Sequence, residues 1–416
     1  MVSLMRFNRA ILVMCFAAII VSCAGPRRIT FTNPVDTKDK PIALQQKRVE
    51  FVPEMGIYIS NDFPSARLNQ LSVKNDSTLI LRIQPENAPI NNSAYFAFKT
   101  WATSNKVVNF QFEYPEGYKH RYVPKYQIAR GPWVQADSLM FAVKDSIATL
   151  RFNISKDTAL IAAQELQTTN NVKDWYTNIS QKNSDVSRLK VVGKTHLGKD
   201  IPMMDIYKGT KDNKDIIVLL TRQHPPEVTG YLAFQSFLET VLESGELSDA
   251  FLEKYRVLAF PLMNPDGVDL GHWRHNAGGV DLNRDWSKYR QPEVYAVAHQ
   301  IEQIIEEEEV RVLLGLDFHS TWHDVFYTNV ERESTNLPNF VSDWFAQLEA
   351  NIPDYEVNEK SAISTRPVSK GWFLKRFNAV GITYEIGDET PRDFITLKGK
   401  VSAYEMMKLL TEQQLK

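Results

Sequence analysis

The second half of the chain alternates apolar segments of two lengths. Short, continuously apolar runs are typical of buried strands. Such runs lie at residues 215–222, 257–262, 310–318 and 379–386. Longer segments with apolar positions three or four residues apart are typical of helices. These lie at residues 228–242, 292–309 and 396–415. The alternation predicts an α/β domain over residues 170–416, with a mixed, mostly parallel sheet flanked by helices.

The preceding region has a different pattern. Between residues 49 and 154, short runs alternate apolar and polar positions, and Asn, Pro, Gly and Asp separate them. The clearest runs lie at residues 77–83, 95–98, 106–113 and 139–143. This pattern is typical of an all-β sandwich. We therefore predict an all-β sandwich domain over residues 48–160, preceded by a polar tether over residues 23–47.

The N-terminus has the pattern of an export signal. Arg6 and Arg9 precede an apolar run over residues 10–21, which is too short to span a bilayer. The run ends in Ile-Val-Ser-Cys, which resembles a bacterial lipoprotein signal with Cys23 as the acylated first residue. We expect residues 1–22 to be a signal peptide and the lipid on Cys23 to anchor the protein in the cell envelope, at the outer membrane facing the periplasm. A plain signal peptide or an uncleaved anchor is the alternative.

Composition adds two limits. The chain has 48 basic and 50 acidic side chains, a formal net charge of −2. Recognition of nucleic acid generally depends on a basic patch or stripe, so we expect no nucleic-acid partner. The cysteines are Cys15 and Cys23, and removal of the signal would leave the mature chain without a disulfide.

Two short motifs carry the residues of a metal site. His224-Pro225-Pro226-Glu227 follows the first apolar run, and Asp317-Phe318-His319-Ser320 closes the third. A catalytic zinc usually takes three imidazole and carboxylate ligands and leaves a fourth position open. The ends of neighbouring strands in an open α/β sheet commonly meet at a ligand site. His224, Glu227 and His319 are therefore candidate zinc ligands.

Other pairs have similar spacing, so spacing alone is weak evidence. His299 and Glu302 fall within the helix predicted at residues 292–309 and read as a solvated helix face. His272 and His275 are also spaced like ligands, as are His319 and His323. The last two lie in strand-like sequence, where residues four apart are about 13 Å apart and do not chelate readily.

The segment over residues 264–286 strengthens the hypothesis of a functional site. Asn-Pro-Asp-Gly is a turn signal, and the rest is a Gly-rich loop that contains Arg274 and Arg284. Loops positioned by a sheet commonly carry binding groups. An ordinary surface loop with solvated arginines is the alternative for either residue taken alone.

Together these motifs resemble a known family. HPPE, NPDG, DLNRDW, DFHS and GITYEIGDE follow one another in the order and approximate spacing of the zinc metallocarboxypeptidases. The resemblance covers roughly residue 190 to the C-terminus and implies the carboxypeptidase A-like fold. Residues 95–135 resemble, more loosely, the β domain that precedes the catalytic domain in cytosolic-type carboxypeptidases.

The resemblance implies a role for each motif residue at the metal. His224, Glu227 and His319 would bind one zinc ion per chain. Glu385 would be the general base that takes a proton from the zinc-bound water. Asp281 would orient the first zinc histidine, in line with the general finding that metal-bound histidines donate their other N–H to a carboxylate or carbonyl. A salt bridge at a strand end is the alternative for Glu385.

The resemblance also implies how substrate would be held. Arg274 would steady the oxyanion, where one well-placed donor is typically worth about 3 kcal/mol. Asn283 and Arg284 would grip the terminal carboxylate of the substrate, which a planar guanidinium can bind through two donors. The expected partner is therefore a peptide with a free C-terminal carboxylate.

One family feature is missing. Members usually carry a tyrosine on a loop some twenty residues before the catalytic glutamate, but residues 359–372 contain none, and Tyr355 lies too far upstream. Arg366 and Lys370 stand in that segment instead. The leading expectation is a zinc-dependent exopeptidase that hydrolyses the C-terminal peptide bond. The alternatives are a zinc hydrolase of peptidoglycan stem peptides or N-acyl amino acids, and an inactive peptide-binding lipoprotein.

Overall fold

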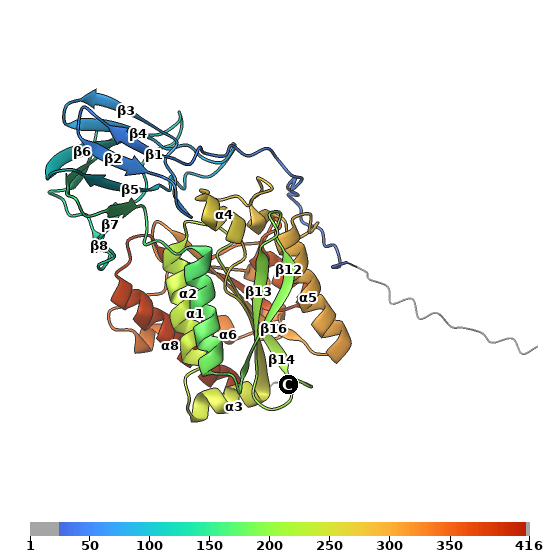
Figure 1. The fold of residues 1–416 in the computed structure, drawn as a ribbon. Helices are drawn as coiled ribbons and strands as arrows, with labels where there is room; N and C mark the ends of the chain where they lie inside the picture. The colour runs from blue at the N-terminus through green and yellow to red at the C-terminus, as the bar shows by residue number, and fades with distance from the viewer. Residues whose placement is uncertain (1–24, 413–416) are drawn as a thin grey trace, which may run out of the picture.

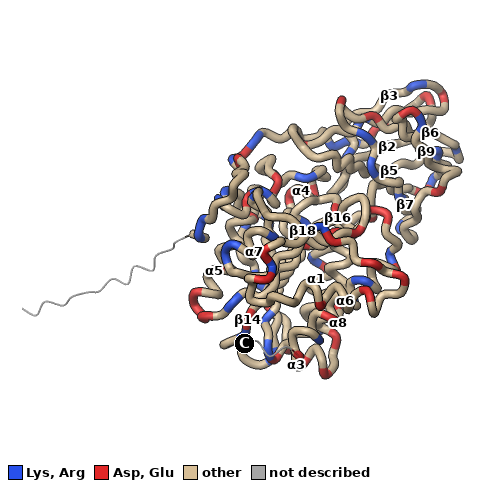
Figure 2. Tube along the Cα trace, turned by 180° about the vertical axis from the view of Figure 1, so that it is seen from behind, with Lys and Arg blue, Asp and Glu red and all other residues tan. Residues whose placement is uncertain are grey.

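A computed structural model describes residues 25–412 of the chain (Figure 1). The predicted signal peptide and Cys23 lie outside these residues, so the lipid anchor stays a prediction. Within the described part of the chain, no helix is both long enough and apolar enough to cross a bilayer. Basic and acidic residues are interspersed along the trace in Figure 2, in keeping with the small net charge.

The N-terminal part, which we call the β region, consists of two sheets. The first has the strand order β1-β2-β5-β11-β7-β8 and the second β3-β4-β6-β10-β9. All pairs are antiparallel except β4 with β6. The strands are β1 (Val49–Val52), β2 (Ile57–Ser60), β3 (Gln70–Asn75), β4 (Thr78–Arg82), β5 (Ala97–Ala102), β6 (Lys106–Glu113), β7 (Lys125–Ile128), β8 (Val134–Gln135), β9 (Phe141–Lys144), β10 (Ile147–Ile154) and β11 (Ala159–Ala162).

The two sheets of the β region share one apolar core. Inward-facing side chains alternate with outward-facing ones, as along β10, where every second residue from Ala148 to Ile154 is buried. Phe98 of β5 and Phe110 of β6 meet across the core with ring centroids 5.2 Å apart. The predicted all-β sandwich is therefore confirmed as an architecture, whereas the domain boundaries given above stay predictions.

The rest of the chain, which we call the α/β region, is built on one sheet with the order β12-β13-β15-β14-β16-β19-β17-β18. The four inner strands β15, β14, β16 and β19 run parallel, and antiparallel pairs flank them. The strands are β12 (Ser187–Lys194), β13 (Asp200–Ile206), β14 (Asp215–Thr221), β15 (Tyr255–Phe260), β16 (Val312–Thr321), β17 (Val325–Thr328), β18 (Glu359–Ser361) and β19 (Val380–Gly387). The predicted mixed sheet is confirmed.

Helices cover both faces of this sheet (Figure 1). Helices α1, α2, α3, α6 and α8 pack on one face, and α5 and α7 pack on the other. The helices are α1 (Thr169–Lys182), α2 (Val228–Val241), α3 (Glu246–Lys254), α4 (Pro265–Leu270), α5 (Pro292–Glu308), α6 (Phe340–Asn351), α7 (Ser369–Phe377) and α8 (Arg392–Glu412), with 3-10 turns η1 (Leu282–Arg284) and η2 (Val330–Ser334).

Strand β14 shows why the central strands read as continuous apolar runs. Ile217 and Leu219 join the core under α2, whereas Ile216, Val218 and Leu220 join the core under α5. A parallel strand covered on both faces has no polar side, so its sequence does not alternate.

Three elements differ from the predictions. Strand β16 continues to Thr321, so His319 lies within the strand and not after its end. The predicted turn at Asn264 is the start of helix α4, because the Asn264 side chain accepts a hydrogen bond from Gly267 N and Pro265 occupies the first helical position. Helix α8 begins at Arg392, four residues earlier than predicted, and its last predicted residues lie outside the described range.

Residues 25–48 contain no helix or strand and run along the α/β region towards β1 (Figure 1). Asn33 N donates to Thr365 O at 2.8 Å, and Lys40 N donates to Gly278 O at 2.8 Å. Thr37 Oγ1 donates to Asp285 Oδ1 at 2.5 Å. Part of the segment predicted as a tether therefore lies against the protein surface.

Candidate metal centre and active site

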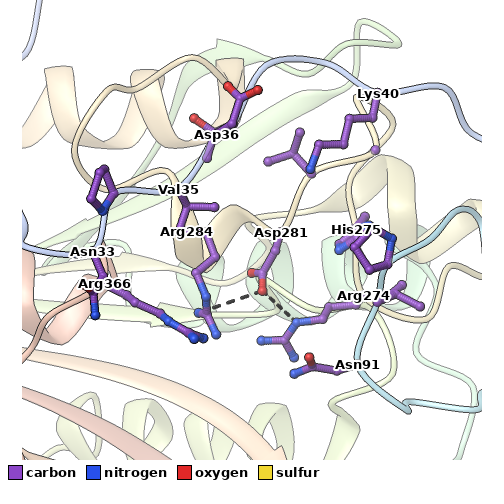
Figure 3. A pocket seen from close by; sticks show the side chains of 16 residues that line it. Asn33, Val35, Asp36, Lys40, Asn91, Arg274, His275, Asp281, Arg284 and Arg366 are labelled. Atoms are coloured by element: carbon purple, nitrogen blue, oxygen red, sulfur yellow. Dashed lines mark hydrogen bonds and ion pairs between the residues drawn. The ribbon is translucent and has the colours of Figure 1, made fainter.

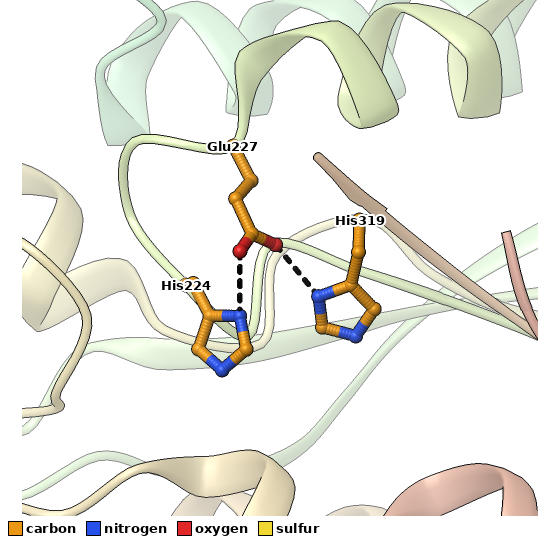
Figure 4. Close-up of side chains that lie close together, drawn as sticks. All are labelled: His224, Glu227 and His319. Carbon is orange, nitrogen blue, oxygen red and sulfur yellow. Dashed lines mark hydrogen bonds and ion pairs between the residues drawn. The ribbon is translucent and has the colours of Figure 1, made fainter. Parts of the chain in front are cut away.

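Three side chains from separate elements meet at the predicted metal site (Figure 4). His224 follows β14, Glu227 immediately precedes α2, and His319 lies in β16. Glu227 Oε1 lies 2.9 Å from His224 Nδ1, and Glu227 Oε2 lies 2.6 Å from His319 Nδ1. One ligand atom from each residue falls within 4.8 Å of the others. Among the described residues, this is the group with metal-ligand geometry.

Local packing brings the two motifs together. A Cβ at Gly230 would lie 2.3 Å from His319 O, so only glycine lets the first turn of α2 approach β16 this closely. Arg222, with a positive φ of 58°, donates through Nη2 to Pro225 O at 2.8 Å. These contacts fix the short loop between His224 and Glu227.

The far nitrogens of both histidines also face carboxylates. His224 Nε2 lies 2.9 Å from Asp281 Oδ1, and His319 Nε2 lies 2.8 Å from Asp317 Oδ2. A carboxylate behind a metal-bound imidazole fixes its orientation and raises its basicity. Asp281 was predicted in this position. Asp317 was missed, although it stands two residues before His319 on one strand and so faces the same way.

The donor set fits a zinc ion. Two imidazole nitrogens and one carboxylate converge, which is the ligand set of many catalytic zinc sites. Burial would raise the pKa of Glu227, but the charges of His224 and His319 outweigh burial and hold its pKa well below the ordinary value.

The two predicted arginines converge on Asp281 (Figure 3). Arg274 Nε donates to Asp281 Oδ2 at 2.7 Å, and Arg284 Nη1 lies 3.8 Å from the same oxygen. Asn283 N donates to Asp281 Oδ1 at 2.9 Å. Residues 282–284 form the 3-10 turn η1, which Asp281 caps. The turn still keeps Asn283 beside the metal site, with its Nδ2 3.3 Å from His319 Nε2.

Glu385 reaches the same site from the neighbouring strand. Its Cα is paired with that of His319 in the parallel ladder between β19 and β16. Within the described part of the chain, its Oε2 is buried and has no hydrogen-bond partner. Burial raises the pKa of Glu385 to about 8, although the charge of His319 acts in the opposite direction.

Two adjoining cavities surround these groups. One, of about 440 Å³, is lined by the three candidate ligands, Glu385 and Asn283. The other, of about 630 Å³, is lined by Arg366 and Lys40 and by residues 33–37 of the N-terminal segment. Asn91, Arg274 and Arg284 line both. Figure 3 shows the guanidinium groups of Arg274, Arg284 and Arg366 pointing toward one another, which makes the shared boundary positively charged.

Arg121 and Tyr327 are among the residues of the smaller cavity that the sequence analysis did not predict. Arg121, between β6 and β7, donates from Nε to Asp388 Oδ2 at 2.7 Å and from Nη2 to Asp388 Oδ1 at 3.1 Å, so the β region also reaches the site. Tyr327 of β17 lines the same cavity. No motif marks Arg121, and Tyr327 lies in an ordinary strand pattern, so the sequence offered no signal for either.

Lys370 and Tyr355, both considered in the sequence analysis, make contacts within the protein. The Lys370 ammonium donates to Thr328 O and Asn329 Oδ1, each at 3.0 Å, and burial lowers its pKa to about 8. Tyr355 packs against Phe394 with ring centroids 5.8 Å apart, in the core under the helices. Lys370 also lines the smaller cavity, but these hydrogen bonds engage its ammonium group.

Among the described residues, neither His272 with His275 nor His299 with Glu302 belongs to the group with metal-ligand geometry. His272 Nδ1 lies 2.9 Å from His275 O. Glu302, predicted on a solvated helix face, is buried and accepts hydrogen bonds from Arg376 Nε at 2.9 Å and Nη2 at 3.1 Å. The prediction for Glu302 was wrong because a basic side chain from α7 covers that face of α5.

Comparison with known proteins agrees with this site. The family model for zinc carboxypeptidases matches residues 172–401, more than half of the chain. The chain therefore belongs to the zinc carboxypeptidase family, whose members are hydrolases, as the motifs predicted.

Cytosolic carboxypeptidases from two animals are similar to part of this chain. The chain is 27% identical to Cytosolic carboxypeptidase 3 of Mus musculus over 188 residues, or 43% of this chain and 18% of that protein. It is 27% identical to Cytosolic carboxypeptidase 6 of Caenorhabditis elegans over 161 residues, or 36% of this chain and 34% of that protein. The chain thus spans a fifth to a third of these relatives.

Two solved structures share the fold over nearly their whole length. A metallo-carboxypeptidase from Burkholderia cenocepacia superposes with a TM-score of 0.71 at 17% identity, covering 86% of this chain and 99% of that one. A metallo-carboxypeptidase from Pseudomonas aeruginosa, in complex with (2-guanidinoethylmercapto)succinic acid, gives 0.66 at 17% identity, covering 85% and 98%. Because these matches cover more of this chain than the α/β region, the likeness includes part of the β region.

Proposed function

We propose that this protein removes single residues from the C-terminus of peptides, with one zinc ion per chain held by His224, Glu227 and His319. The observation that carries the proposal is the convergence of this ligand set, Glu385 and two guanidinium groups on adjoining cavities. Zinc in such a site supplies a Lewis acid for the scissile carbonyl and lowers the pKa of a water molecule.

Glu385 is the general base of the proposed reaction. Its buried carboxylate has a raised pKa, which favours acceptance of a proton from the attacking water and its later donation to the leaving amine. Arg274 donates to the oxygen on which negative charge develops, because Asp281 directs its guanidinium to the side of Glu227, with Arg274 Nη1 3.9 Å from Glu227 Oε1.

Arg284 and Asn283 hold the terminal carboxylate of the substrate. Arg284 Nη1 donates to Asn283 O at 2.7 Å, which anchors one edge of the guanidinium while the group lines both cavities. A planar guanidinium binds a carboxylate through two parallel donors. This contact would confine cleavage to chain ends.

Product masses test the proposal. Protein beginning after Cys23 is incubated with a mixed library of peptides and muropeptides, with and without a chelator. We expect loss of single C-terminal residues, abolished by the chelator and by Glu385→Gln. Peptides with an amidated C-terminus should resist cleavage. No cleavage by protein that contains stoichiometric zinc would contradict the general peptidase function.

A second candidate substrate class has one observation in its favour. Arg366 lines the larger cavity beside Arg284, where it could contact a second acidic group of a peptidoglycan stem peptide or an N-acyl amino acid. Cleavage of muropeptides without cleavage of ordinary peptides would favour this class. Zinc binding and peptide binding without any turnover would instead favour a binding lipoprotein.

We further propose that a lipid on Cys23 anchors the enzyme in the bacterial cell envelope. The support is the sequence of residues 1–23 alone. Mass spectrometry of the mature protein should find an acylated N-terminal cysteine, and Cys23→Ser should release the protein from the outer membrane fraction. Recovery of unchanged amounts of Cys23→Ser in that fraction would contradict lipid anchoring.

A further inference from the structure

The loop that carries Arg274 is held by the β region. Residues 271–279 follow α4 on the way to η1, yet the Trp273 side chain lies fully buried in the core of the β region. Trp273 Nε1 donates to Tyr95 O at 3.0 Å, and its ring meets Tyr118 edge-on at a centroid distance of 5.4 Å. At Gly271, with φ 65°, a Cβ would lie 2.3 Å from Ala66 O, so the two regions touch through their backbones.

A single carboxylate from the β region caps this loop. Glu86, between β4 and β5, is fully buried. Its Oε2 accepts a hydrogen bond from Trp273 N at 2.8 Å, and its Oε1 accepts from Arg274 N at 3.0 Å and His275 N at 2.6 Å. The neighbouring Asn87 donates from Nδ2 to Gly279 O at 3.0 Å.

The charge of Glu86 is compensated inside the protein. Burial opposes ionisation, but the charges of His272, Arg67 and His275 and the N–H group of Trp273 together outweigh it, so the pKa of Glu86 lies below its ordinary value. Hydrogen bonds to an ionised acceptor are about twice as strong as neutral ones. Three of them on consecutive residues fix the path of the backbone at Arg274.

Arg274 is thus fixed at both ends. Its backbone N–H is the middle donor to Glu86, and its Nε donates to Asp281 at 2.7 Å. A change at the backbone end would move the guanidinium relative to Glu227, whose Oε1 is 3.9 Å from Arg274 Nη1. Misplacement of a catalytic group by about 1 Å can cost roughly 100-fold in rate.

We propose that Glu86 is a positioning residue for Arg274, so that the β region takes part in catalysis through this carboxylate. The proposal rests on the proposed role of Arg274 at the developing oxyanion. A donor that acts only in the transition state affects kcat and leaves KM unchanged. A Glu86 that merely joined the two regions would instead change stability, with no selective effect on kcat.

Glu86→Gln tests this role, because an amide replaces one acceptor oxygen with a donor that repels the loop N–H groups. We expect kcat to fall about 10- to 100-fold with KM and zinc content unchanged. Glu165→Gln is the matched control. Glu165 lies between the regions and accepts from Arg392 Nε and Nη2, each at 2.8 Å, and among the described residues no hydrogen bond or ion pair joins it to residues 271–279. The kcat of Glu165→Gln should stay within about twofold of the wild type, as expected for a change outside the site.

A double-mutant cycle separates positioning from a general loss of structure. Arg274→Ala should lower kcat by roughly 100-fold or more. In that background Glu86→Gln should have almost no further effect, because the residue it positions is gone. An equal loss in both backgrounds would overturn the proposal, and so would an unchanged kcat in Glu86→Gln alone.

Hydrogen exchange gives a readout that does not depend on turnover. Peptides spanning residues 271–279 should exchange faster in Glu86→Gln and not in Glu165→Gln, and unchanged exchange would overturn the proposal. If Glu86→Gln fails to fold, Glu86→Asp keeps the charge facing Arg67 but shortens the side chain and takes its place. A harmless Arg274→Ala would contradict the proposed function, whereas a harmful Arg274→Ala with a harmless Glu86→Gln would contradict this inference alone.

Discussion

The α/β region and the β region both reach the cleft, through different kinds of structure. In the α/β region, His319 and Glu385 stand on adjacent parallel strands, and His224 follows a third strand. In the β region, Glu86 and Arg121 come from loops between strands. The sheet of the α/β region therefore sets the spacing of the reacting groups directly.

The two regions therefore contribute to the site in different ways, one through residues held by the sheet and the other through residues in loops. Ligands on neighbouring strands are held by the ladder hydrogen bonds of a buried sheet, which is the most rigid part of a domain. Glu86 acts on a loop of the other region, and Arg121 binds Asp388 just after β19. Changes in the α/β region should therefore remove chemistry, whereas changes in the β region should weaken it.

The largest expected effect comes from removal of the metal ligands. Glu227→Gln or treatment with a chelator should lower activity to background, because a Lewis acid worth several kcal/mol is lost. Zinc should restore the chelated wild type and not the variant. His224→Ala should also lose zinc and activity, and His299→Ala is its matched control. His299 is also followed by a glutamate three residues later, but it lies on α5, stacked on Tyr295. Metal analysis and turnover should separate the two, and equal zinc loss in both would contradict the assignment.

Glu385→Gln should have the next largest effect. A general base typically contributes 10²- to 10⁴-fold, so we expect kcat to fall within that range. Zinc content should stay at one per chain, because Glu385 is outside the ligand set. Turnover assays measure the loss of kcat, and metal analysis measures the zinc that is retained. A loss below tenfold would assign the proton transfer to another group and would weaken the contrast between the two regions.

The sequence predicted the α/β region well for a physical reason. Its central strands are buried on both faces, so they read as continuous apolar runs, and each motif follows or closes one of them. The family match over residues 172–401 confirms the resemblance that those motifs carried. Helix α4 was missed because Asn264 and Pro265 signal a turn and a helix start equally well.

Contacts between the regions could not be predicted from the sequence. Glu86 and Arg121 are single polar residues in loops, and their partners lie 188 and 267 positions away. Nothing in the local pattern distinguishes a buried loop glutamate from a solvated one. The same holds for Lys370, whose burial depends on contacts to Thr328 and Asn329.

The third largest effect is expected for binding of the substrate's terminal carboxylate by Arg284. Arg284→Lys should raise KM and lower kcat/KM by about 10- to 100-fold, because the ammonium is a point donor without the planar fork. The loss should be small for an amidated substrate, which is already poor. Arg311→Lys is a control, since Arg311 pairs with Asp215 at the opposite end of the sheet, with Nη2 2.6 Å from Oδ2. Steady-state kinetics with matched free and amidated peptides give KM and kcat/KM for each substrate. An equal loss of kcat/KM on the two substrates would contradict binding of the terminal carboxylate by Arg284.

The smallest effect compares one cation from each side of the larger cavity. Lys40 of the N-terminal segment and Arg366 of the α/β region both line it and are both exposed. Exposed charge pairs are typically worth 0.2–1 kcal/mol, so Lys40→Gln and Arg366→Gln should each raise KM by less than about fivefold. Measurement of KM at rising salt separates long-range electrostatic attraction from direct contact. The Debye length falls from about 10 Å at 0.1 M salt to about 3 Å at 1 M. We expect both effects to vanish at high salt. An Arg366→Gln effect that persists there, beside a Lys40→Gln effect that vanishes, would mean that Arg366 contacts the substrate directly, and the α/β region alone would then determine substrate preference.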